Sequence, residues 1–307
     1  MARRLARIAW GRYLHKPHEE RRILEGLLRQ TPGAQGIWGE VEFTIERVDS
    51  CDFLLIADQP SADIEVTVPP GNVWSFTIEP PNEYFRHLHA AERSIARCYT
   101  SDPEPASANA VQTFVPINWH IGKSYDELVA APCPDKLKRT CFITSNSTHF
   151  QGHKDRVNFL KALAGVIPFH LFGRGYADFT CKGDVLAPYK NTIVVENFSN
   201  SLYWSEKLAD AFLGYCLPIY FGCNRVAEYF PRDSFLEIDI HSESVFEELA
   251  SLDLDRLWQQ RYEAIRQARS RVLYEYNFFS FFAHQILMSE VGRPERITIP
   301  ASAAGNL

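Results

Sequence analysis

The stretch that decides the fold runs from Tyr189 to Gly222 and reads YKNTIVVENFSNSLYWSEKLADAFLGYCLPIYFG. It opens with an apolar, β-branched run that is typical of a buried strand and that ends at Glu196-Asn197. A polar loop follows, and from Leu208 onward apolar residues recur at the i, i+3, i+4 and i+7 positions of one helix face. A second apolar run, Leu217–Phe221, completes the unit. The stretch therefore predicts a strand, a helix over Glu206–Tyr215 and a second, parallel strand.

The same alternation continues in both directions and predicts parallel sheets with helices on both faces. The expected strands are Leu5–Trp10, Asp52–Asp58, Val73–Ile78, Ile95–Tyr99, Thr140–Thr144, Pro168–Phe172, Thr192–Val195, Leu217–Phe221 and Phe235–Ile240; the expected helices are Glu19–Gln30, Lys154–Ala164, Glu206–Tyr215, Ser242–Ala250 and Leu254–Tyr274.

The domain boundary is expected in the Pro-rich, charged segment Ala130–Lys138. At about 150 residues per domain, a chain of 307 residues suggests two domains. We expect an N-terminal domain over 1–132, a C-terminal domain over 133–290 and a flexible tail over 291–307.

The composition, with 46% hydrophobic and 23% charged residues, excludes a disordered chain, a collagen and a coiled coil. The net charge of -6 disfavours a nucleic-acid partner. Seven cysteines without a C-x-x-C pair predict reduced, mostly buried thiols.

No stretch reaches the roughly 18–20 apolar residues that span a membrane, and we expect a cytoplasmic protein. Two segments leave peripheral membrane contact open. The basic residues 1–22 suit either an anionic membrane surface or solvent. The aromatic run over 274–282 suits a membrane or partner patch, or a C-terminal helix packed across both domains. The oligomeric state is not fixed by the sequence.

Polar residues follow several of the predicted strands. They are Glu79, Ser145-Asn146, Gly173-Arg174 and Glu196-Asn197. Because parallel sheets bind ligands at the carboxyl ends of their strands, we expect these residues to line a site.

The predicted helix after Glu196-Asn197 starts near Tyr203 and carries Lys207 in its first turn. Free N–H groups and a lysine suit a phosphate or pyrophosphate. A phosphate would repel Glu206, which is therefore expected to contact hydroxyls or to order Lys207 and Tyr203. No metal site is expected, since the pairs His87/His89 and His149/His153 lack acidic or thiol company.

This stretch resembles glycosyltransferase family 10, the α1,3/α1,4-fucosyltransferases, and looks bacterial-type because the anchor helix of animal and plant members is not seen. The matching motifs over about 48 residues are Tyr189-Lys190, Glu196-Asn197, Tyr203, Glu206-Lys207-Leu208, Pro218-Ile219-Tyr220, Gly222 and Tyr229–Leu236. The chain departs from the family at Val195-Glu196-Asn197-Phe198-Ser199, where Phe-Glu-Asn-Ser is usual, and at Leu202, where an acidic residue is usual.

The resemblance implies a GT-B-like α/β fold, with two Rossmann-like domains whose parallel sheets face a central cleft. It implies inverting transfer of L-fucose from GDP-β-L-fucose to a hydroxyl of a GlcNAc- or Gal-containing glycan, as in lipopolysaccharide or an oligosaccharide. No cofactor is required beyond the donor substrate GDP-fucose, and the pyrophosphate is neutralised by Lys207, Arg174 and backbone N–H groups.

The resemblance also implies residue roles. The donor-binding set is Ser145, Asn146, Arg174, Glu196, Asn197, Tyr203, Glu206 and Lys207, with His153 and Arg156 as a weaker match. The catalytic base is Glu79, which Pro80-Pro81 follows, and Glu83 is the rival base. Physically, a base must lie within hydrogen-bond reach of the acceptor hydroxyl.

Two alternatives stay open. The same fold could use another sugar nucleotide such as GDP-mannose, or the chain could be a catalytically silent glycan- or nucleotide-binding protein. Glu79 favours the enzyme, because a binding protein needs no base. The linkage and the acceptor are not fixed by the sequence.

Overall fold

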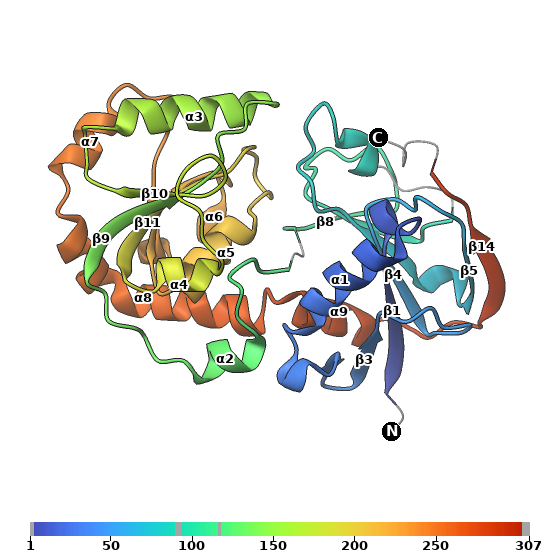
Figure 1. Ribbon diagram of the computed structural model, residues 1–307. Coiled ribbons are helices and arrows are strands. Elements are labelled where there is room, and N and C mark those ends of the chain that lie inside the picture. The colour runs from blue at the N-terminus through green and yellow to red at the C-terminus, as the bar shows by residue number, and fades with distance from the viewer. Residues whose placement is uncertain (1–2, 90–93, 116–117, 303–307) are drawn as a thin grey trace. The chain divides into compact units, whose positions relative to one another are not determined.

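The computed structural model describes residues 3–89, 94–115 and 118–302 (Figure 1). The chain divides into two compact units. Unit 1 comprises Met1–Asn118, Ser124–Asp126 and Tyr276–Leu307, and unit 2 comprises Trp119–Lys123 and Glu127–Glu275. Each unit is built around its own sheet.

Unit 1 contains a seven-stranded sheet in the order β2-β3-β1-β4-β6-β7-β8. Neighbouring strands are parallel except for the antiparallel pair β2–β3. The strands are β1 (Arg4–Trp10), β2 (Ile37–Trp38), β3 (Val41–Thr44), β4 (Phe53–Ala57), β6 (Val73–Phe76), β7 (Arg97–Thr100) and β8 (Ala110–Gln112).

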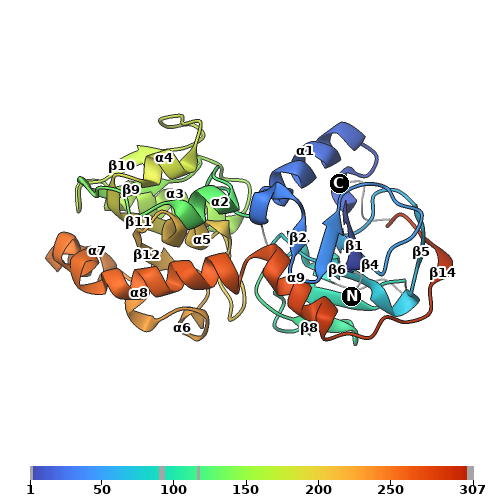
Figure 2. The same cartoon turned by 90° about the horizontal axis from the view of Figure 1, so that it is seen from below.

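The two faces of this sheet are covered differently. Helices α1 (Pro17–Leu28) and α9 (Phe278–Leu287) pack on one face in a single apolar cluster. The other face packs against a two-stranded antiparallel ribbon of β5 (Ile64–Val68) and β14 (Glu295–Ile299), which run side by side in Figures 1 and 2. Alternation along β4 explains this, because Phe53 and Leu55 face the helices while Leu54 and Ile56 face the ribbon.

Unit 2 contains a five-stranded parallel sheet in the order β10-β9-β11-β12-β13. Helices α3 and α7 pack on one face, and α4, α5 and α8 lie against the other (Figure 1). The elements are β9 (Lys138–Ile143), α3 (Gln151–Leu163), β10 (His170–Phe172), α4 (Lys182–Leu186), β11 (Tyr189–Val195), α5 (Glu206–Leu213), β12 (Leu217–Phe221), α6 (Val226–Tyr229), β13 (Leu236–Glu237), α7 (Val245–Ser251) and α8 (Leu254–Tyr274); α2 is Tyr125–Ala130.

The prediction of two α/β domains with parallel sheets is confirmed. The prediction of helices on both sheet faces is confirmed for unit 2, whereas in the described residues of unit 1 helices cover one face and the β5–β14 ribbon covers the other. The expected boundaries 1–132, 133–290 and 291–307 differ from the two units. The chain returns to unit 1 at Tyr276, because Phe278, Phe279 and Phe282 of α9 are buried in its core. Within the expected flexible tail, Glu295–Ile299 is a strand paired with β5.

The basic N-terminal residues are partly structural rather than solvated. Arg7 is buried within β1, and Arg4 Nη1 donates hydrogen bonds to the carbonyls of Ile286 and of Ser289. Among the described residues, every helix is too short or too polar to cross a membrane. Five of the seven cysteines are buried, as expected.

Candidate active site

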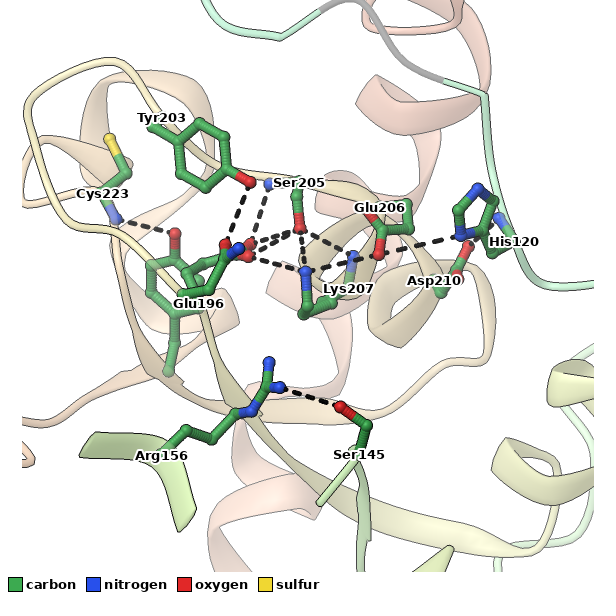
Figure 3. Close-up of polar contacts among 12 residues, drawn as sticks. His120, Ser145, Arg156, Glu196, Tyr203, Ser205, Glu206, Lys207, Asp210 and Cys223 are labelled. Atoms are coloured by element: carbon green, nitrogen blue, oxygen red, sulfur yellow. Dashed lines mark hydrogen bonds and ion pairs between the residues drawn. The ribbon is translucent and has the colours of Figure 1, made fainter. Parts of the chain in front are cut away.

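The candidate site in unit 2 is built around Glu196, which directly follows β11 (Figure 3). Its buried carboxylate accepts a hydrogen bond from the Ser205 backbone N–H at 2.8 Å, and the Ser205 hydroxyl lies 2.8 and 2.6 Å from its two oxygens. Lys207 Nζ donates to the same carboxylate at 3.2 Å. Ser205 is also the N-cap of α5, since its Oγ accepts from the Lys207 N–H. The end of β11 and the start of α5 are thus tied together.

The residues after β12 fit closely against Glu196. Val195 pairs with Phe221, so the two strands end side by side. A Cβ atom at Gly222 would come within 2.5 Å of both Glu196 Cγ and the Tyr220 hydroxyl. A larger residue there would displace one of these two side chains, which gives a physical reason for glycine at this position.

Lys207 joins two carboxylates. Its Nζ lies 3.2 Å from Glu196 Oε2 and 3.4 Å from Glu206 Oε1. Burial alone would lower the pKa of Lys207, but the charges of Glu196 and Glu206 outweigh it and raise the pKa. Burial would likewise raise the pKa of Glu206, but Lys207, His120 and Lys182 outweigh it and lower the pKa. Both groups are therefore charged at neutral pH.

Arg156 adds a second cation from α3. Its side chain is buried and points toward the Glu196–Lys207 cluster in Figure 3. Its Nη2 donates to the Ser145 hydroxyl at 3.2 Å, whereas its buried Nε has no hydrogen-bond partner among the described residues. A buried donor without a partner costs free energy, so an anion bound here would satisfy it.

His153 reports the sign of the local field. Burial, followed by the charges of Arg156, Lys207, His149 and Arg174, lowers the pKa of His153 to about 4. A protonated imidazole is disfavoured where cations gather, and the same field favours a bound anion. The cations Arg156, Arg174 and Lys207 lie around the carboxylates Glu196 and Glu206, while the nearby Lys182 and Asp210 pair with each other, so the site can accept negative charge.

This field gives a direct prediction with inorganic pyrophosphate as the probe. A bound anion stabilises the imidazolium, so the pKa of His153 should rise from about 4 when pyrophosphate is added. Because binding then takes up a proton, the contribution of His153 to pyrophosphate affinity should grow as the pH falls from the pKa of the bound state toward that of the free state. An NMR titration of the His153 ring, with and without pyrophosphate, measures this pKa. The His153→Gln variant assigns the signal and shows how much of the pH dependence of binding comes from the titration of pyrophosphate itself. An unchanged pKa at saturation would contradict it.

The structure brings the predicted donor residues of unit 2 into two adjoining groups. Glu196, Lys207 and Glu206 form the ion-pair cluster, and the Tyr203 hydroxyl donates to Asn197 Oδ1 at 3.2 Å. At the ends of β9 and β10, the Asn146 N–H donates to the Arg174 carbonyl at 3.1 Å, Ser145 contacts Arg156, and the Arg174 side chain is exposed. For Asn146 and Arg174 this is a backbone contact. Their roles in binding stay predictions.

Sequence reasoning missed three members of this site. Ser205 had a local signal, since serine before a helix is a typical N-cap. His120 and Asp210 had none. His120 Nδ1 lies 3.8 Å from Glu206, and its backbone N–H donates to the buried Asp210, which also pairs with Lys182 at 2.7 Å. These contacts join segments far apart in the sequence.

Glu79 belongs to unit 1, where it follows β6. Its carboxylate is half-buried and lies 3.2 Å from Arg12 Nη1. Its backbone carbonyl is 3.0 Å from Nε2 of the buried His89. Glu83, the rival, is exposed in the turn that follows. Glu79 is therefore the carboxylate that the fold holds in place.

Among the described residues, no group of three or more His, Cys, Asp or Glu side chains is arranged to hold a metal ion.

A cavity of about 350 Å³ lies near the amino end of β9, lined by residues that include Arg139, Pro168 and Asp255. None of its lining residues is among the predicted site residues, which follow the carboxyl ends of the strands.

A comparison with known families matches the part of the chain that holds the Glu196–Lys207 cluster. Residues 133–285 match the family described as "Glycosyltransferase family 10 (fucosyltransferase) C-term". The chain is 27% identical over 111 residues to 4-galactosyl-N-acetylglucosaminide 3-alpha-L-fucosyltransferase 9 of Bos taurus and of Homo sapiens. Each match covers 34% of this chain and 30% of the relative, so the chain spans less than a third of the curated relatives it matches.

Solved structures are similar along most of the chain at low identity. The crystal structure of an alpha1,3-fucosyltransferase is similar with a TM-score of 0.49 and 16% identity, covering 96% of this chain and 93% of that one. The crystal structure of alpha1,3-fucosyltransferase with GDP-fucose has a TM-score of 0.46 and 15% identity, covering 95% and 92%.

Proposed function

Through residues 133–285 this chain belongs to glycosyltransferase family 10, the fucosyltransferases, and on that premise we propose that it transfers L-fucose from GDP-β-L-fucose to a glycan hydroxyl with inversion. The acceptor is a GlcNAc- or Gal-containing glycan, such as a lipopolysaccharide or an oligosaccharide. The observation that carries the proposal is the Glu196–Ser205–Lys207 cluster inside the family match. It lies beside Arg156, whose Nε has no hydrogen-bond partner in the part of the chain that the structure describes. A cytoplasmic location stays a prediction from the sequence.

The donor side of the reaction falls to unit 2. The bond from fucose C1 to the β-phosphate oxygen breaks, and that oxygen leaves with the electron pair as part of GDP. Lys207, Arg156 and Arg174 supply the positive charge that stabilises the growing charge on the diphosphate. Glu196 and Glu206 keep Lys207 ionised and oriented. In this proposal, Glu206 also accepts a hydrogen bond from a sugar hydroxyl.

The acceptor side falls to Glu79. The acceptor oxygen forms the new bond to C1 from the face opposite the leaving diphosphate, which inverts the configuration. Its proton passes to the Glu79 carboxylate, which acts as general base. Glu79 is preferred to Glu83 because its carboxylate is paired with Arg12 and its backbone is held by His89.

A donor screen tests the proposal. The protein is incubated with GDP-fucose, GDP-mannose and UDP-sugars in the presence of a lactosamine-type acceptor, and the released nucleotide is measured. We expect GDP release with GDP-fucose. Release with GDP-mannose alone would assign a different donor, and GDP binding without release from any donor would identify a silent binding protein.

Transfer is expected to persist in EDTA. The reason is that Lys207, Arg156 and Arg174 supply positive charge next to the proposed diphosphate position. The measurement is the initial rate before and after exhaustive treatment with EDTA. Complete loss of activity that Mn²⁺ restores would show that an ion carries part of this charge.

A further inference from the structure

Unit 1 contains a second buried carboxylate beside the proposed base, and it is one that the mechanism above does not use. Asp58 directly follows β4, and only 4% of its side chain is exposed. Its Oδ1 accepts a hydrogen bond from the Ile78 N–H at 3.1 Å, one residue before Glu79. Its Oδ2 lies 3.6 Å from Arg12 Nη2, while Arg12 Nη1 lies 3.2 Å from Glu79. Asp58 is therefore linked to Glu79 in two ways, through the Ile78 N–H and through Arg12.

The backbone around Asp58 is held in an unusual arrangement. Asp58 has φ +57°, in the left-handed region that few residues other than glycine, asparagine and aspartate adopt readily. Its own N–H donates to the Phe76 carbonyl at 2.7 Å, which ties the turn after β4 to the end of β6. A non-glycine residue in this region persists where the surroundings fix it, and such positions are frequent at functional sites.

Arg12 is brought to Asp58 by a close approach of the turns after β1 and β4. A Cβ atom at Gly11 would come within 2.3 Å of the Gln59 carbonyl oxygen, so only glycine fits there without displacement. The Ser61 N–H donates to the Gly11 carbonyl at 2.8 Å. The guanidinium of the next residue, Arg12, is thereby placed between Asp58 and Glu79.

From this geometry, and resting on the proposed function, we propose that Asp58 is the positioning residue of the base: it fixes the Glu79 segment through Ile78 and shares the charge of Arg12 with Glu79. Without the Asp58 charge, Arg12 pairs with Glu79 alone, and the segment that carries Glu79 loses its charged partner at the end of β4. Asp58 thus sets where Glu79 lies and how Arg12 holds it.

The electrostatic surroundings give this proposal a pH signature. Burial raises the pKa of Asp58 to about 6, and the Arg12 charge opposes this only in part. The acid limb of the rate profile should therefore include the titration of Asp58. Among the described residues, the charged and titratable groups around the pair include Arg12, Tyr13, Cys98 and His89, with the Arg86–Asp102 ion pair at 3.3 Å beyond His89.

Asp58→Asn is the sharpest test, because asparagine tolerates the same backbone conformation and keeps an acceptor oxygen for the Ile78 N–H while losing the charge. We expect GDP affinity at the wild-type value and fucosyl turnover lower by about 10–10²-fold, the scale of a misplaced catalytic group. We also expect the acid limb of kcat/KM to move to lower pH, because the buried carboxylate whose pKa burial raises to about 6 has been removed.

Control variants separate the possible outcomes. Asp52→Asn removes a carboxylate at the other end of the same strand, β4, where its Oδ2 accepts a hydrogen bond from the Leu5 N–H at 2.7 Å, and it should leave the acid limb in place. Arg12→Lys keeps the charge but cannot bridge two carboxylates with a planar fork, so it should lower turnover as Asp58→Asn does, and it decides the question if Asp58→Asn does not fold. A wild-type protein without fucosyl transfer would refute the proposed function. The outcome that would overturn this inference alone has three parts. The wild type is active, Glu79→Gln is inactive, and Asp58→Asn or Arg12→Lys keeps the wild-type turnover and acid limb.

Discussion

Replacing Glu79 with glutamine is expected to lower fucosyl turnover by about 10²–10⁴-fold, the usual contribution of general base catalysis. Glutamine keeps the size of the side chain but cannot take the acceptor proton. GDP affinity should hardly change, because Glu79 lies in unit 1 while the proposed diphosphate residues lie in unit 2. The loss of the partly exposed Arg12–Glu79 ion pair should cost at most about 1 kcal/mol of folding stability.

Glu83→Gln is the matched control for this substitution. It removes an exposed carboxylate four residues away in the same segment, and turnover should stay near the wild-type value. Turnover lost in Glu83→Gln and kept in Glu79→Gln would move the base to Glu83. Turnover kept in both variants would show that neither carboxylate is the base.

Replacing Lys207 with methionine is expected to weaken GDP binding by about 1–3 kcal/mol, or about fivefold to 150-fold. Two effects add. The diphosphate loses a cation, and Glu196 and Glu206 lose the charge that lies 3.2 and 3.4 Å away and screens them from the ligand. The upper part of the range is therefore expected, as measured by calorimetric titration of GDP.

Lys190→Met provides the matched control for Lys207. Lys190 is also a partly buried lysine in an ion pair, 3.0 Å from Asp255, but it lies at the amino end of β11, whereas Lys207 lies by its carboxyl end. Melting temperatures of both variants show how much stability each ion pair contributes. Wild-type GDP affinity in a folded Lys207→Met protein would refute the donor site.

Much of unit 2 could be predicted because its signals are local. The apolar runs of β11 and β12 and the helical periodicity of α8 lie within single continuous segments, and Leu254–Tyr274 was predicted to the residue. The buried, β-branched sequence of β11 also indicated a central strand, and in the sheet it lies between β9 and β12.

The errors in unit 1 come from non-local pairing. Glu295 lies opposite Val68 in the β5–β14 ribbon, and no pattern within either short segment indicates a partner so far away in the sequence. For the aromatic run over 274–282, the sequence left open a membrane or partner patch or a helix packed across both domains, and it did not indicate the unit 1 sheet. Helix α9 packs on the same face of the unit 1 sheet as α1, through Phe278, Phe279 and Phe282, although it follows most of unit 2 in the chain.

The candidate site shows the same division. The roles of Glu196 and Lys207 could be proposed from the sequence because the end of a strand and the start of the next helix lie in one continuous stretch. The contacts that tune them were not, since His120 reaches Glu206 from a segment more than eighty positions earlier. Asp58 was expected only as the end of a strand, and its link to Glu79 depends on the order of β4 and β6 in the sheet.

The most direct test of the central claim is a product analysis. The purified protein is incubated with GDP-β-L-fucose and an N-acetyllactosamine acceptor, and the product is examined by mass spectrometry and by NMR of the new anomeric proton. We predict an acceptor heavier by one fucosyl residue, an α linkage that reports inversion, and one GDP released for each product formed. An unmodified acceptor with intact GDP-fucose, under conditions where the protein binds GDP, would contradict it.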